Sequence, residues 1–133
     1  MIDGNTIRIR DSQSQLYEVV FAGVDAPELT QSFGGEAKAF LSNLLLKQKV
    51  TADIQGKDRK GNYIAIVLLK KTDPRLELLK EGLLWTSEKD PIPLLEKHRV
   101  EAKEKSKGLW KEDNPTPPWI HRRQQSMMNP KSS

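Results

Sequence analysis

The chain has 133 residues, of which 36% are hydrophobic and 30% charged, with no cysteine and a formal net charge of +4. This length suits one domain, and the lack of cysteine excludes disulfides and thiolate metal sites. The basic balance favours polyanionic partners, and no apolar run approaches the roughly 18 residues of a membrane span.

The first part of the chain predicts a β-hairpin followed by a helix. Residues 5–10 alternate isoleucine with polar side chains, DSQSQ interrupts the pattern, and residues 16–24 resume with a high apolar content. That arrangement is typical of two paired strands. Apolar side chains then recur at helical spacing, which predicts a helix over residues 36–47.

A second hairpin and two further helices follow. Residues 49–55 alternate again, a turn centres on Gly61, and residues 63–69 are nearly all apolar. Asp73 and the proline after it predict the start of a short helix that stops at Gly82. A last helix is expected over residues 93–107, with a glycine at its end.

These elements predict one α+β domain with a small barrel over residues 1–111. Residues 112–133 form a different region, rich in proline and basic side chains and without apolar periodicity. We expect this tail to dock partly through Trp119 and to be disordered beyond Arg123.

A set of oxygen donors lies at the start of one predicted strand and the end of its partner. The set comprises Asp3, Asn5, Asp25 and Glu28. Hard cations such as Ca²⁺ prefer carboxylate, amide and carbonyl oxygens, and Pro27 fixes the backbone that aims Glu28. The alternative is that Pro27 ends a strand and the acids are simply solvated.

The turn KDRKGN, residues 57–62, is the second candidate. Its Arg59 and Lys60 suit phosphate contacts, although a polar hairpin tip explains the same composition.

Six segments in order resemble the motifs of the thermonuclease family, typified by staphylococcal nuclease. They are IDGNT, GVDAPE, FGGEAKAFL, KDRKGN, LLKEGLLW and EAKEKSKGLW, and NPTPPWIHRR resembles the tail of many bacterial members. The resemblance covers the chain from Ile2 to about Arg123.

That resemblance implies an oligonucleotide-binding (OB) fold: a five-stranded β-barrel with three helices. It also implies Ca²⁺-dependent hydrolysis of phosphodiesters in RNA and in single-stranded or frayed DNA. We expect a monomer with no membrane segment in this chain. The chain begins inside the first family motif, so most of the family's first strand and any export signal or anchor would lie upstream of Met1. Either Met1 is a true start and the barrel is slightly clipped, or the chain is a fragment, so secretion or membrane attachment stays open.

The resemblance carries over residue by residue. Asp25 matches a Ca²⁺ ligand, Glu28 matches the glutamate that activates water, and Ala26 stands where the family uses a backbone carbonyl as ligand. Asn5 stands where the family has a ligand aspartate, which removes one negative charge, and Asp3 is an acid nearby.

The two arginines that clamp the phosphate in this family are both replaced, by Val20 and Asn62. Arg59 and Lys60 are candidate substitutes, although a lysine cannot form the planar fork of a guanidinium. We therefore predict a nucleic-acid-binding domain with a degenerate phosphodiesterase site and weak or absent cleavage. The alternatives are an active Ca²⁺-dependent nuclease and a protein-interaction scaffold.

Overall fold

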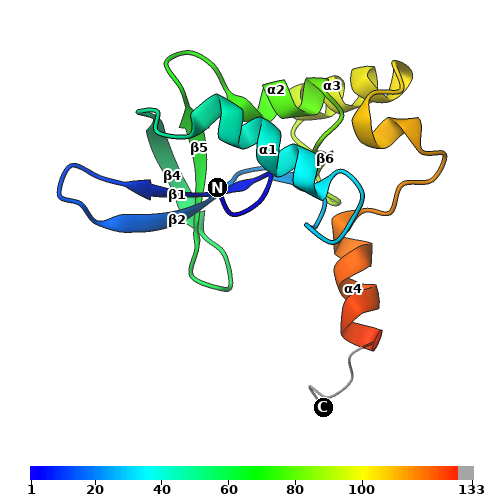
Figure 1. Ribbon diagram of the computed structural model, residues 1–133, viewed down its shortest axis with the longest axis horizontal. Helices are drawn as coiled ribbons and strands as arrows, with labels where there is room; N and C mark the ends of the chain where they lie inside the picture. The colour runs from blue at the N-terminus through cyan, green and yellow to red at the C-terminus, as the bar shows by residue number, and fades with distance from the viewer. Residues whose placement is uncertain (129–133) are drawn as a thin grey trace.

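In the computed structural model, which describes residues 1–128, the chain forms two small sheets and four α-helices (Figure 1). The strands are β1 (Thr6–Arg10), β2 (Leu16–Phe21), β3 (Val24–Asp25), β4 (Thr51–Lys57), β5 (Tyr63–Leu68) and β6 (Trp85–Thr86). The helices are α1 (Gly34–Leu45), α2 (Pro74–Lys80), α3 (Pro93–Glu104) and α4 (Pro118–Met128), with a 3-10 turn, η1, at Gly108–Lys111.

The larger sheet has the strand order β1-β2-β5-β4. Both predicted hairpins are confirmed, because β1 pairs with β2 and β4 pairs with β5 in antiparallel register. The two hairpins join through parallel pairing of β2 and β5, in which Val20 lies opposite Ile64. The second sheet pairs β3 with β6. The α+β fold is thus confirmed. The expected five-stranded barrel is not closed within the described residues, because β1 and β4 are the two edge strands of the sheet and do not pair with each other.

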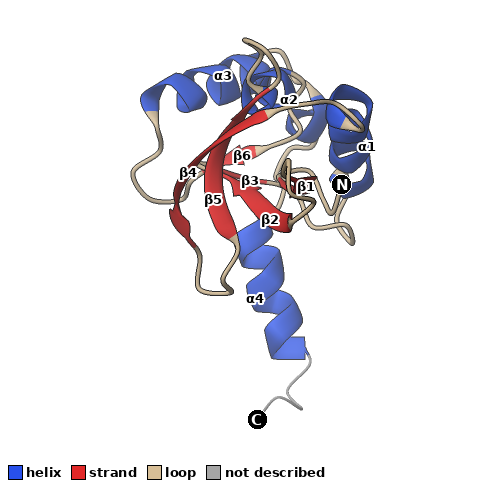
Figure 2. Cartoon of the chain, turned by 90° about the vertical axis from the view of Figure 1, so that its left-hand side faces the viewer, coloured by secondary structure: helices blue, strands red, loops and turns tan. Residues whose placement is uncertain are grey.

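Helices α1, α2 and α3 gather on the same side of the larger sheet, and the core lies between these layers (Figure 2). Helix α1 buries Gly34, Ala37, Leu41 and Leu45, which recur every three or four residues and so form one apolar stripe. Helix α2 begins as its sequence predicts, with the Asp73 side chain accepting a hydrogen bond from the Arg75 backbone and with Pro74 in the first turn.

The C-terminal region differs from the expectation of disorder beyond Arg123. Helix α4 continues from Pro118 to Met128 and projects away from the three other helices (Figures 1 and 2). Pro118 pre-sets the first helical turn, and the apolar and polar side chains that follow contain no strong helix breaker. The rest of the predicted disorder lies outside the described residues. Within residues 1–128 there is no helix with the length and apolar character needed to span a membrane.

Candidate active site

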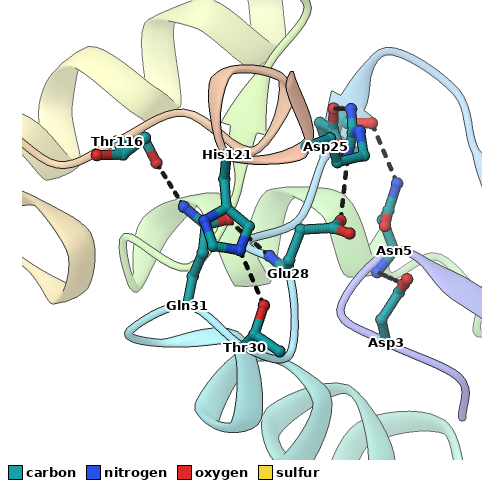
Figure 3. A network of polar contacts seen from close by, with 10 residues as sticks. Asp3, Asn5, Asp25, Glu28, Thr30, Gln31, Thr116 and His121 are labelled. Carbon is teal, nitrogen blue, oxygen red and sulfur yellow. Dashed lines mark hydrogen bonds and ion pairs between the residues drawn. The ribbon is translucent and has the colours of Figure 1, made fainter. Parts of the chain in front are cut away.

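Asp25 and Glu28, hereafter the acid pair, lie at the end of β3 and in the loop after it (Figure 3). Asp25 is held in register opposite Trp85 of β6. The Glu28 backbone N–H donates to the Gln31 side-chain oxygen at 2.8 Å, and the Gln31 N–H donates to the Glu28 carbonyl at 2.8 Å. The side chains of Asp25 and Glu28 are 25% and 34% exposed. Both carboxylates are therefore fixed by the backbone yet open to a ligand.

The glycine pair before α1 has a structural role in this loop. An ideal Cβ on Gly34 would lie only 2.1 Å from the Glu28 carbonyl oxygen, whereas one on Gly35 would meet nothing within 4 Å. Gly34 thus lets the start of α1 touch the loop that carries Glu28. Two adjacent glycines are the only sign of this contact in the sequence.

Asn5 lies beside the acid pair and is only 7% exposed. Its side-chain amide donates to the Val24 carbonyl at 3.3 Å, and its backbone N–H donates to the Asp3 carboxylate at 3.0 Å. Ala26 is 2% exposed, so its side chain belongs to the core. The structure brings the predicted oxygen donors together at one end of β1.

A residue that the sequence analysis did not single out makes the closest charged contacts with the acid pair. Arg122 of α4 donates to Asp25 through Nη1 at 3.3 Å and Nη2 at 2.8 Å, and its Nη1 also donates to Glu28 at 3.0 Å. These contacts, led by the hydrogen bond to Asp25, raise the pKa of Arg122 above its ordinary value, although desolvation opposes the shift. The guanidinium therefore stays charged between two carboxylates.

Several contacts seat the first turns of α4 against the domain. The Trp119 ring meets Trp85 edge to face at 5.6 Å between centroids, and Trp85 meets Trp110 likewise at 4.9 Å. His121 Nε2 lies 2.9 Å from the Thr30 hydroxyl. Just before the helix, the Thr116 carbonyl accepts from Gln31, the residue that also holds Glu28 (Figure 3). Gln31 thus links the tail to the loop that carries Glu28.

Val20 and Asn62, the two positions at which the family resemblance would place an arginine, carry uncharged side chains. Val20 lies partly buried in the middle of the sheet, between Thr6 and Ile64. Asn62 closes the β4–β5 turn by hydrogen-bonding Asp58 through its backbone at 2.9 Å and its amide at 3.2 Å. In that turn, Asn62 therefore has a structural partner of its own.

The candidate substitutes lie at the exposed tip of the same turn. The side chains of Arg59 and Lys60 are exposed, and within residues 1–128 neither makes a hydrogen bond or ion pair with the acid pair. Their role in phosphate contact stays a prediction.

The fit of a Ca²⁺ ion to these residues is incomplete. In the described part of the chain, no group of three or more His, Cys, Asp or Glu side chains is placed to hold a metal. Both acid-pair carboxylates already accept from Arg122, and the Asn5 amide is turned to the Val24 carbonyl. Ca²⁺ takes about six to eight oxygen ligands, water among them, so water would have to complete the set that these protein donors begin.

Comparison with known proteins agrees with the fold. A family model described as staphylococcal nuclease homologue matches residues 18–112, a span that includes Asp25, Glu28 and Asn62. The chain belongs to the staphylococcal nuclease family. The match to motifs in the sequence is thereby confirmed at the level of the family.

Relatives of this staphylococcal nuclease-like chain carry nuclease names. An "uncharacterized endonuclease" of Haemophilus influenzae is 34% identical over 128 residues, covering 94% of this chain and 71% of the relative. One of the same name from Escherichia coli O157:H7 is 29% identical, covering 92% and 80%. A "micrococcal nuclease" of Shigella flexneri is 28% identical, covering 92% and 77%. These alignments span most of both chains, so the likeness extends over the domain.

Proposed function

We propose that this chain is a nucleic-acid-binding domain whose phosphodiesterase site is reduced, so that cleavage is weak or absent. The observation that carries the proposal is the pairing of an intact acid pair with uncharged side chains at Val20 and Asn62. Removing one preorganised charge donor from a transition state costs about 10²- to 10³-fold in rate. Two lost donors and a weakened metal set, with Asn5 in place of an acid, leave little efficient turnover.

An open groove supports the binding half of the proposal. A hollow of about 980 Å³ lies between β1 and β4, the two unpaired edges of the larger sheet among the described residues. Its lining is mainly apolar and includes basic side chains, one acid and two aromatic rings: Arg8, Arg10, Lys49, Asp11, Tyr17 and Tyr63. Proteins that bind single-stranded nucleic acid combine positive charge along a groove with aromatic rings on which bases stack. We therefore expect RNA and single-stranded or frayed DNA as ligands.

The second candidate function is an active Ca²⁺-dependent nuclease. Two observations favour it: the nuclease names of the relatives, and the arginine that α4 brings to the acid pair. When bound, Ca²⁺ would offset charge on the phosphate oxygens, and Asp25, Asn5 and the Ala26 carbonyl are the donors that the family resemblance assigns to it. Glu28 would then orient or deprotonate the attacking water.

One experiment separates these functions. The chain and a Glu28→Gln variant are incubated with heat-denatured DNA and Ca²⁺, and binding of a labelled single-stranded oligonucleotide is measured at low and high salt. The glutamine still accepts a hydrogen bond from Arg122 but loses the charge needed for proton transfer. We expect binding that weakens steeply with salt, and little cleavage by either protein.

The other outcomes assign the other functions. Robust Ca²⁺-dependent cleavage that the Glu28→Gln change abolishes would overturn the reduced site and establish the active nuclease. Absence of salt-sensitive binding by the unmodified chain would overturn a nucleic-acid role and leave the protein-interaction scaffold.

A further inference from the structure

We propose that Arg122, on the C-terminal helix α4, is the residue that contacts the phosphate of a nucleic acid bound at the acid pair. The proposal rests on the function proposed above. It assigns to the tail the guanidinium that Val20 and Asn62 do not provide, so that the tail is part of the ligand site.

The structure places the Arg122 guanidinium directly beside the acid pair. Both terminal nitrogens of Arg122 contact Asp25, and one also contacts Glu28. The side chain is nevertheless 46% exposed. A guanidinium carries more N–H donors than the three contacts use, so an incoming phosphate oxygen can be bound without first breaking them.

A phosphate bound beside the acid pair needs a neighbouring cation. Two neighbouring carboxylates repel a phosphodiester, and in this structure Arg122 is the cation that contacts both of them among the described residues. Carboxylates that hold an arginine also restrict its rotamers before the ligand arrives. Less conformational entropy is then lost on binding, which favours the complex.

The anchoring of α4 directs Arg122 toward the acid pair, whereas its neighbour Arg123 makes no ion pair with the described residues. Trp119 and His121 contact Trp85 and Thr30, which fixes the first turns of α4 on the domain. Arg123 is the next residue, is exposed, and makes no ion pair with the described residues. Arg123 therefore serves as a control of equal charge on the same helix.

The test measures binding of a fluorescein-labelled oligothymidine by the full chain and its Arg122→Ala, Arg122→Gln and Arg123→Ala variants over a range of salt. We expect Arg122→Ala to weaken binding about tenfold to a hundredfold, the usual effect of losing a charged hydrogen bond. The slope of log affinity against log salt should fall by about 0.7, the value for one lost contact with a single strand. Arg123→Ala should change both quantities less.

The Arg122→Gln variant is the control for detachment of α4 from the domain, which Arg122→Ala could cause. The introduced amide keeps a donor for Asp25, and near-ultraviolet circular dichroism of the tryptophan cluster reports whether α4 remains seated. Weakened binding with a seated helix supports the proposal. Equal binding by the Arg122 and Arg123 variants overturns it.

A third measurement addresses competition between Arg122 and a cation. If Arg122→Ala binds Ca²⁺ and the oligonucleotide more tightly than the unmodified chain, Arg122 blocks the site and the proposal is overturned. If the unmodified chain shows no salt-sensitive binding at all, the proposed function itself fails. The two failures are thereby distinguished.

Discussion

At the scale of single residues, the site depends on close backbone approach as much as on its charged groups. Asp25 and Glu28 can be found from their motif, but the loop that carries Glu28 takes its path because Gly34 has no side chain. The Asn5 side-chain N–H likewise has a partner, the Val24 carbonyl, that accounts for this donor without a metal. Residue type alone therefore does not separate a ligand from a structural hydrogen-bond donor.

Gly34 and Gly35 offer a matched pair for a stability test. Alanine at position 34 must push the Glu28 backbone away, and we expect it to lower the free energy of unfolding by about 1–3 kcal/mol, as overpacking usually does. Alanine at position 35 meets nothing and should be neutral or stabilising by up to about 1 kcal/mol, since alanine favours helix. Urea unfolding of both variants checks this, and equal effects would contradict it.

At the scale of elements, side-chain bonds tie the helices to the strands. Glu96 of α3 accepts from the Thr86 hydroxyl of β6 at 2.7 Å and from Arg99 one turn along its own helix. β6 in turn pairs with β3, the strand that ends at Asp25. These bonds thus fix β6, and through its pairing with β3 they help to hold Asp25 in place. Periodicity located these helices within a few residues, but such cross-element bonds leave no pattern in the sequence.

The Glu96 contacts predict a pH dependence of stability. The hydrogen bond from Arg99 lowers the pKa of Glu96 from its ordinary value of 4.5, against the opposing effect of desolvation and with help from Thr86. A lowered pKa in the folded state means that the stabilisation is present above the unfolded value and is lost as pH falls through the folded one.

We therefore expect the stability difference between the unmodified chain and Glu96→Gln to be largest near neutral pH and to shrink below about pH 4.5. Thermal unfolding between about pH 3 and 7 measures it. Glu77→Gln, which removes an exposed pair with Lys80, is the control and should show a smaller difference at neutral pH. A difference for Glu96→Gln that is independent of pH would contradict the assignment.

At the scale of the whole molecule, the first turns of α4 pack on the domain beside the acid pair. The tryptophans that hold α4 are far apart in the sequence, at positions 85, 110 and 119, and meet edge to face. Each such aromatic pair contributes about 0.5–1.5 kcal/mol beyond the burial of its surface. Loss of one pair is therefore expected to weaken the seating of α4 while the core is retained.

The variant Trp119→Ala tests this coupling. Its ring meets Trp85 and, among residues 1–128, makes no hydrogen bond with the acid pair. A fall in oligonucleotide affinity similar to that of Arg122→Ala would therefore show that the seated helix is needed. Near-ultraviolet circular dichroism reports the tryptophan cluster, and thermal unfolding checks the core. Met127→Ala, 79% exposed near the end of α4, is the control. An unseated helix with unchanged affinity would count against the coupling.

The sequence alone determined the α+β class, both hairpins, the first three helices and the family, and it predicted the acid pair. These features depend on local periodicity, on capping residues and on short contiguous motifs, all of which act over a few neighbouring positions. The structure decided three further matters: the open edge between β1 and β4, the contact of Gly34 with the Glu28 loop, and the placement of Arg122 on Asp25. The last joins residues 97 positions apart, and only tertiary packing of the tail can bring such groups together.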